Sequence, residues 1–185
     1  MVLKLKQALN LILSSEPIIV PTDTVYGLVC RHDSKSAIEK IYKLKKREEK
    51  KPLILIGYNW KVLQKFVRVK LDHSKSLQKL IKTNWPGPLT IILPVSKKVP
   101  KCLNEKFKTI GIRVPENKFL LKLLKHCPEQ VLASTSANLS GKSDHYPQKA
   151  LLKKVKLFIK AKKNEMSLKP SRIIEFKKGI IKVLR

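Results

Sequence analysis

The sequence predicts an α/β fold built on a mixed sheet of parallel and antiparallel strands. Short apolar runs typical of buried strands alternate with stretches in which apolar residues recur at helical spacing, the pattern of strand–helix–strand units. The last two apolar runs, residues 172–176 and 180–184, are separated by Lys177-Lys178-Gly179, which is typical of a hairpin. Strand–helix–strand units pair strands in parallel and a hairpin pairs them antiparallel, so both kinds of pairing are expected.

Helical spacing is clear over residues 35–45, where Ile38 and Ile41 fall on one face. Asp33 or Ser34 is placed to cap that helix. We expect the other helices at residues 2–14, 59–68, 74–84, 117–126 and 147–155. Besides the hairpin, we expect strands at residues 17–21, 25–30, 53–57, 89–95, 109–114, 130–134 and 157–159.

The length and composition indicate one folded, soluble domain over residues 1–185. No apolar run approaches the roughly 20 residues that a membrane span needs, so we expect no membrane association. Three cysteines lie far apart without a CxxC pair, which favours reduced thiols in a cytoplasmic protein. The four histidines show no HxxxH or Cys/His spacing, so we expect no structural zinc.

The net charge of +28 creates a field that attracts nucleic acids, nucleotides or anionic membranes. Lysine supplies 35 of the 41 basic residues, whereas proteins that read nucleic acid sequences rely on arginine for bidentate contacts. A lysine excess of this kind is also compatible with compositional drift in an AT-rich genome. The charge therefore supports a polyanionic ligand without identifying it.

The segment STSANLSG, residues 134–141, directly follows the apolar run 131–133. It offers hydroxyls, an amide and backbone N–H groups without charge or bulk, which suits a ligand rich in acceptor oxygens such as phosphate. The alternative is a serine-rich turn with no ligand.

Three other segments place polar or cationic groups beside predicted strands. PTDTVYG, residues 21–27, carries two threonine hydroxyls and a carboxylate, and is either a binding loop or a turn capped by its own side chains. Arg113 is the one cation of an otherwise apolar strand and needs an anionic partner, either a substrate carboxylate or Asp23 or Glu116.

Lys45 and Arg47 end the helix over residues 35–45 and can reach one polyphosphate, or can be solvated cations favoured by the helix dipole. No GxSxG, carboxylate pair or Cys/His constellation is present. Cations and hydroxyls with little acid–base machinery suit phosphoryl or nucleotidyl transfer, in which catalysis is largely positioning and charge neutralisation.

Five motifs together resemble the YrdC/TsaC-type threonylcarbamoyl-adenylate synthases. They are PTDTVYG, the Lys-x-Arg at Lys45 and Arg47 followed by PLILI, NWPGPLT, GIRVP and STSANLSG, and they recur in the family's order. The resemblance covers about residues 8 to 185 and implies a YrdC-like twisted mixed sheet with flanking helices around a basic concave cavity. The chain looks like the short bacterial single-domain form.

The resemblance implies the reaction of L-threonine, bicarbonate and ATP to L-threonylcarbamoyl-AMP and pyrophosphate, with Mg²⁺ accompanying ATP. Downstream tRNA-modifying partner proteins would use the product to modify A37 of tRNAs that read ANN codons.

The resemblance also implies roles for eleven residues of this chain. On the threonine side it implies Thr24, Arg113, Ser134 and Ser171. On the ATP side it implies Lys45, Arg47, Lys51, Thr109, Ser136, Asn138 and Arg185. The resemblance assigns the catalytic work to Lys45, Arg47, Arg113, Ser136 and Asn138.

The chain departs from the family pattern at a few positions. Glu48 stands where the family has proline, which we expect to loosen the loop and to add negative charge beside the phosphates. Lys51 stands where many relatives have asparagine, Ile56 replaces a histidine of the longer relatives, and Arg172 stands where threonine is frequent.

Two other functions remain open from the sequence. One is a double-stranded RNA-binding or ribosome-maturation factor without catalysis, which would also allow binding to tRNA. The other is a carbamoyl-handling enzyme related to the YrdC-like domain of hydrogenase maturation factors, which would need carbamoyl phosphate and usually a larger chain.

Overall fold

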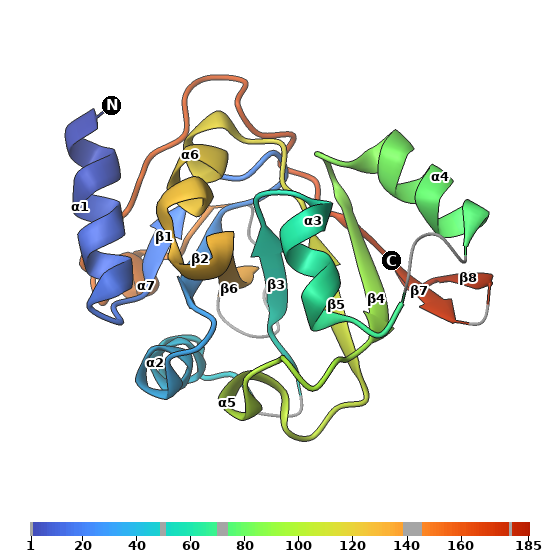
Figure 1. Ribbon diagram of the computed structural model, residues 1–185. Coiled ribbons are helices and arrows are strands. Elements are labelled where there is room, and N and C mark those ends of the chain that lie inside the picture. Colours follow the sequence, from blue (N-terminus) through green and yellow to red (C-terminus); the bar gives the residue numbers. More distant parts are fainter. Residues whose placement is uncertain (1, 49–50, 70–73, 139–145, 178) are drawn as a thin grey trace.

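A computed structural model describes residues 2–48, 51–69, 74–138, 146–177 and 179–185 (Figure 1). The described strands form one sheet in the order β1-β2-β6-β3-β5-β4-β7-β8. Their bounds are Ile18–Val20 (β1), Gly27–Arg31 (β2), Ile54–Gly57 (β3), Leu89–Pro94 (β4), Thr109–Arg113 (β5), Val131–Ser136 (β6), Arg172–Lys177 (β7) and Ile180–Val183 (β8). Two neighbouring pairs, β3 with β5 and β4 with β7, are parallel, and the other pairs are antiparallel. The predicted mixed sheet is therefore confirmed.

The described helices flank this sheet. They are Val2–Leu13 (α1), Lys35–Lys45 (α2), Trp60–Leu63 (α3), Lys75–Asn84 (α4), Lys101–Asn104 (α5), Lys118–His126 (α6) and Lys149–Leu152 (α7), with 3₁₀ turns at Gln64–Phe66 and Pro128–Gln130. Within the described parts of the chain, every helix falls short of the length and apolarity that a membrane span requires.

Side-chain caps set the start of the main helices. Ser34 caps α2 by accepting the N–H of Ala37, so the second of the two caps expected from the sequence is the one used. Asn117 caps α6 in the same way, through the N–H of Leu120. These caps satisfy N–H groups that have no partner inside the helix.

Two of the predicted elements are wrong in extent. The helix expected over residues 147–155 is limited to α7, and residues 157–159 form an isolated bridge instead of a strand. The N–H of Ile19 donates to the Leu157 carbonyl, and the N–H of Ile159 donates to the Ile19 carbonyl. The chain must leave the helix early for these bonds to form, so pairing with β1 overrides the helical pattern.

The predicted helix over residues 59–68 is divided in a similar way. It begins at the Asn59 cap but consists of the short α3 followed by a 3₁₀ turn, because the backbone of Val67 is extended and bridges Val95. The short α5 was not predicted from the sequence, since four residues are too few to show a period.

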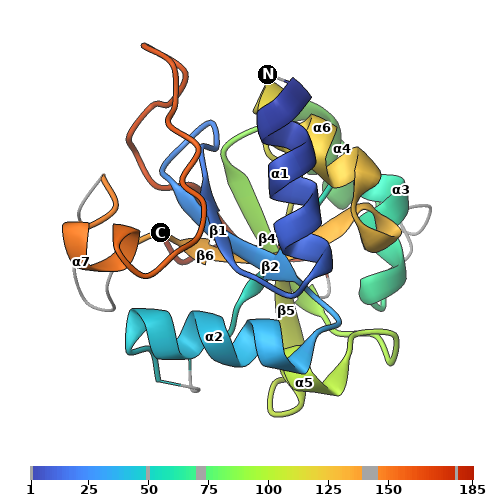
Figure 2. The same ribbon diagram turned by 90° about the vertical axis from the view of Figure 1, so that its left-hand side faces the viewer.

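Two apolar clusters hold the helices to the sheet. One joins the sheet to α2 and α4, through side chains such as Ile41 and Leu77, and the other joins it to α1 and α6, through Ile12 and Leu123. Figure 2 shows α1 beside α6, with α2 on the other side of the sheet. The second cluster ends at Ile56 on β3, so the same face over β5, β4 and β7 is left for a cavity.

We expect Leu123→Ala to lower the free energy of unfolding by about 2–5 kcal/mol, because the Leu123 side chain is fully buried between α6 and the sheet. Lys122→Ala on the exposed side of the same helix should change it by less than about 0.5 kcal/mol. Urea denaturation of both variants measures the difference. Equal effects would contradict the assignment of α6 to the core.

Candidate active site

A cavity of about 570 Å³ lies on the face of the sheet that α1 and α6 leave uncovered. Its floor consists of two rows of residues, and in each row the residues lie side by side on neighbouring strands. One row is Ser134, Ile54, Gly111 and Ile92, and the next is Ile56, Arg113, Thr90 and Ile173. A cavity of this size, in which the isoleucines of the floor are accompanied by a few convergent polar groups, is typical of a small-molecule site.

Gly111 keeps the middle of this floor open. A Cβ atom at this position would lie 2.8 Å from Cγ2 of Ile54 and 3.4 Å from Cγ2 of Thr90. The missing side chain therefore leaves a flat surface between β3 and β4, where a larger residue would collide with its neighbours and fill the cavity.

Arg113 ends β5 as a buried guanidinium whose three nitrogens all have partners. Nε donates to the Gly87 carbonyl at 3.0 Å, Nη1 to Oγ1 of Thr24 at 3.0 Å, and Nη2 to Oδ1 of Asp23 at 2.6 Å. Burial lowers the pKa of Arg113, and the Asp23 carboxylate partly offsets that effect. Of the anionic partners that the sequence left open, Asp23 is the one that pairs with Arg113 in the structure.

The turn that carries Asp23 is built by its threonines. Thr22 Oγ1 donates to the Val25 carbonyl and accepts the N–H of Thr24, which is the self-capped turn considered from the sequence. The same turn also points Thr24 into the cavity, so the two interpretations are compatible. Asp23 Oδ2 is buried and has no hydrogen-bond partner among the described residues.

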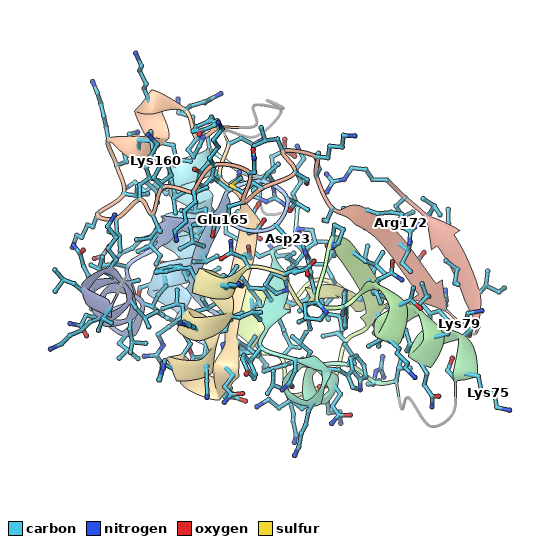
Figure 3. The ribbon with its side chains drawn as sticks, turned by 90° about the horizontal axis from the view of Figure 1, so that it is seen from above. Asp23, Lys75, Lys79, Lys160, Glu165 and Arg172 are labelled. Carbon is cyan, nitrogen blue, oxygen red and sulfur yellow. The ribbon has the colours of Figure 1, made fainter. Side chains whose placement is uncertain are left out.

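A later segment holds this turn in place from outside. The N–H groups of Ser167 and Leu168 donate to the carbonyls of Asp23 and Thr24. Figure 3 shows Asp23 near the middle of the molecule, seen from above. The turn is therefore fixed by side chains within itself, by Arg113 and by a segment far away in the sequence.

Lys45 and Arg47 occupy different positions although only one residue separates them. Lys45 is buried, and its Nζ donates to the carbonyls of Ser136 and Asn138 and to Oδ1 of Asn138. Arg47 lines the cavity, with Nε bonded to the Lys51 carbonyl and Nη2 to the Pro52 carbonyl. Lys45 thus holds the segment after β6, while Arg47 faces the cavity.

The end of β6 places a polar pair at the cavity beside Arg47. Ser136 Oγ donates to Oδ1 of Asn138 at 2.6 Å, and both residues line the cavity together with Ser134. The remainder of STSANLSG, residues 139–141, lies outside the described residues.

The opposite side of the cavity is formed by the entry to β7 and by the last residue. Ser171 Oγ and Thr90 Oγ1 are hydrogen-bonded at 3.0 Å, and Ser171 is buried. Arg185 donates Nε and Nη2 to the Ser171 carbonyl and lines the cavity. A third arginine therefore borders the same space as Arg47 and Arg113.

Most of the site residues expected from the sequence meet in this cavity. Those that line it are Thr24, Arg47, Arg113, Ser134, Ser136, Asn138, Ser171 and Arg185. Three are not among its lining residues. Lys45 is buried behind the segment after β6, Lys51 is exposed, and Thr109 begins β5 on the face of Gly111, one row beyond the floor.

Sequence reasoning missed some residues that shape the site and left others undecided. Thr22 and Thr90 add hydroxyls to the lining, although both belong to quoted motifs. Asp23 is one of the partners that the sequence left open for Arg113, and the structure shows the ion pair. The isoleucines of the floor could not be recognised as site residues from the sequence, because isoleucine is an ordinary residue of buried strands.

Glu48 does not line the cavity. Its side chain is exposed, and Oε1 lies 3.8 Å from Nζ of Lys51. The Glu48 carboxylate, expected to add negative charge beside a phosphate site, therefore faces Lys51 instead. Among the described residues, no group of three or more His, Cys, Asp or Glu side chains could hold a metal ion.

The model of the Sua5/YciO/YrdC family, which carries the description telomere recombination, matches residues 10–185. The chain belongs to this family. The resemblance drawn from the five motifs is thereby confirmed.

Named relatives agree with this assignment. The threonylcarbamoyl-AMP synthase of Photobacterium profundum is 38% identical over 137 residues, which cover 74% of this chain and 73% of the relative. The structure of Pyrococcus abyssi Sua5 complexed with L-threonine matches with a TM-score of 0.86 at 27% identity, over 98% of this chain and 53% of that one. Escherichia coli YciO matches with a TM-score of 0.80 at 28% identity, over 98% and 87%. The chain therefore spans about half of P. abyssi Sua5.

We expect Asp23→Asn to lower the free energy of unfolding by about 3 kcal/mol, because it leaves the buried Arg113 without a counter-charge. Asp33→Asn is the matched control, since Asp33 also pairs with an arginine, Arg31, but its side chain is 33% exposed, against 11% for Asp23. Asp33→Asn should lower the free energy of unfolding by no more than about 1 kcal/mol. Urea denaturation at pH 7 compares them, and similar small losses would contradict a structural role for the Asp23–Arg113 pair.

We expect Lys45→Met to flatten the pH dependence of stability between about pH 8 and 10.5. Burial, assisted by the nearby Arg47, lowers the pKa of Lys45 from 10.5 to about 8. The folded chain then binds fewer protons than the unfolded chain in this window, so wild-type stability rises with pH, and the cost of the buried charge is fully present below pH 8.

Urea denaturation between pH 7 and 10.5 measures this slope. Lys43→Met, on an exposed position of the same helix, should keep the wild-type slope. If Lys45→Met also keeps it, the three oxygen acceptors around Nζ cancel the effect of burial.

Proposed function

We propose that this protein is a threonylcarbamoyl-AMP synthase, which converts L-threonine, bicarbonate and ATP to L-threonylcarbamoyl-AMP and pyrophosphate. The observation that carries the proposal is one cavity in which three arginines and a series of hydroxyls accompany the isoleucines and Gly111 of the floor. It occurs in a chain whose relatives bear this enzyme's name. Such a cavity suits a ligand with a flat base, a polyphosphate and a small polar acid.

Threonine would bind at the end of the cavity formed by the turn before β2 and the end of β5. Arg113 is the cation for its carboxylate, and Thr24, Ser134 and Ser171 supply hydroxyls around it. Asp23 keeps the guanidinium in place and reduces its net attraction for a second carboxylate. Threonine recognition then rests on the hydroxyls as well as on Arg113.

ATP would bind along the floor toward Arg47. The flat surface at Gly111, between Ile54 and Ile92, suits a purine ring, and Arg47 with Arg185 can neutralise phosphate charge. Ser136 and Asn138 offer a hydroxyl and an amide to the same phosphates. Thr109 and Lys51 lie outside the cavity lining and would act at its margin.

Lys45 would act as a positioning residue in this scheme. Its Nζ already bonds to two carbonyls and to Asn138 Oδ1, so it orders the segment that presents Ser136 and Asn138. The direct phosphate contact expected from the sequence is replaced by an indirect role.

The chemistry follows from these positions. The threonine nitrogen adds to CO₂ released from bicarbonate and loses a proton, which forms a carbamate. A carbamate oxygen attacks the α-phosphorus of ATP, and the bond to the departing pyrophosphate breaks. Arg47 and Arg185 stabilise the charge that builds up on pyrophosphate, which is the main catalytic requirement of such a transfer.

Mg²⁺ would arrive bound to ATP. Among the described residues, no group of three or more His, Cys, Asp or Glu side chains is present to hold it. The product would pass to tRNA-modifying partner proteins that act on A37 of tRNAs reading ANN codons. Binding of tRNA or double-stranded RNA by the basic surface is compatible with this function and secondary to it.

Pyrophosphate release from ATP tests the proposal, with radiolabelled bicarbonate and with threonine, serine or no amino acid. Threonine-dependent release together with label in an AMP adduct is the expected result. Folded protein without turnover, but with strong salt-dependent binding of double-stranded RNA, would favour the non-catalytic alternative instead.

We expect Arg47→Ala to lower kcat/KM for ATP by about 10- to 100-fold, because it removes a charge-assisted contact to phosphate. The KM for threonine should change little. Arg68→Ala removes an exposed arginine away from the cavity and is the control for net charge. Equal kinetics of the two variants would remove Arg47 from the ATP site.

A further inference from the structure

The strand β8 is an open, apolar edge of the sheet. It is last in the strand order, and among the described residues it pairs only with β7. Its side chains are exposed to 71% at Ile180, 44% at Ile181 and 62% at Val183, and the following Leu184 to 49%. We refer to residues 180–184 as the β8 edge. The strand at the other end of the sheet, β1, is instead bridged to Phe158.

The backbone of the β8 edge has hydrogen-bonding groups to offer. The N–H of Leu184 donates to the Ile173 carbonyl on β7. Inward and outward groups alternate along an antiparallel strand, so Ile181 and Val183 direct their N–H and C=O groups away from β7. Proteins normally protect such an edge by covering it or by placing several charges or a proline on it. Here Lys182 is the one charge of the strand.

The surroundings of the β8 edge are cationic. Exposed basic residues on β7 and β8 are Arg172, Lys177 and Lys182, and α4 adds Lys75 and Lys79. Figure 3 shows these two lysines and Arg172 on the side of the molecule that carries α4 and the hairpin. Glu175, opposite Lys182 in the register, is the acidic residue of β7. The edge therefore attracts negative charge.

Charge and apolarity together select the class of partner. A second copy of the chain would bring another basic edge and another net charge of +28, so like charges would meet. A nucleic acid would satisfy the lysines but would leave the isoleucines and the valine uncovered. An extended peptide strand that alternates acidic and apolar residues satisfies both, and its backbone can pair with the outward groups.

We propose that the β8 edge is a docking site for an extended acidic and apolar strand of a partner protein, which adds to the sheet beside β8. Arg185, which directly follows the edge, lines the cavity. A docked partner therefore lies next to the cavity and close to any product that is released from it. The proposal concerns a surface outside the cavity and does not depend on which reaction the cavity performs.

Fluorescence anisotropy tests the proposal with the full chain and a labelled eight-residue peptide of alternating glutamate and valine. The edge variant is Ile180→Glu with Val183→Glu, which adds like charge and removes apolar contact. The matched control is Val2→Glu with Leu3→Glu, which makes the same charge change at two exposed apolar positions of α1. A peptide with lysine in place of glutamate tests charge preference.

The expected result is saturable binding of the acidic peptide, weakened on the order of tenfold in the edge variant and nearly unchanged in the α1 variant. The lysine peptide should not bind. Thermal melting establishes that the edge variant is folded. If it is not, Ile180→Thr with Val183→Thr removes the apolar contact while keeping strand propensity, and should weaken binding in the same direction.

Three results would overturn the proposal. Equal weakening in both glutamate variants would mean that the peptide responds only to net charge. Self-association of the wild type, abolished in the edge variant, would assign the edge to a second copy. Weakened binding of a 12-base-pair double-stranded RNA in the edge variant, with peptide binding unchanged, would assign it to nucleic acid.

Discussion

The buried guanidinium of Arg113 is the interaction on which the site depends. It bonds to the turn before β2 through Asp23 and Thr24, and to the loop before β4 through the Gly87 carbonyl. Three segments far apart in the sequence therefore meet at one side chain. Because an unpaired buried charge is costly, loss of these contacts is strongly disfavoured, and the three segments are held together. The position of Thr24 in the cavity follows from this network.

A second buried cation, Lys45, performs a similar task on the other side of the cavity. Its helix is anchored in the core by Ile38 and Ile41, and its Nζ donates to carbonyls at the end of β6 and just after it. The two cations differ in their partners. Arg113 has a carboxylate that partly offsets the lowering of its pKa by burial, whereas the described hydrogen-bond acceptors of Lys45 are neutral oxygens and burial lowers its pKa to about 8. Both order the segments that border the cavity.

Two kinds of cationic surface can be distinguished in this molecule, whose net charge is +28. Inside the cavity, arginines are tied to carbonyl or carboxylate oxygens and face a defined space. Around the β8 edge, exposed lysines of α4, β7 and β8 accompany the apolar side chains of the edge. The first arrangement favours a small ligand of fixed shape. The second favours a flexible partner, because its specificity comes from backbone pairing and from alternation of side chains.

The sequence by itself determined the α/β class, the mixed sheet and most of the polar residues of the cavity, because periodicity and short motifs are local properties. It also determined the family, since five motifs recur in order. Only the tertiary structure decided that Lys45 is buried while Arg47 faces the cavity, that Asp23 neutralises Arg113, and that α7 ends early. Each of these depends on a partner far away in the chain, such as Asn138, Asp23 or Ile19. Burial and pairing between distant segments carry no local signature, so no pattern along the chain could reveal them.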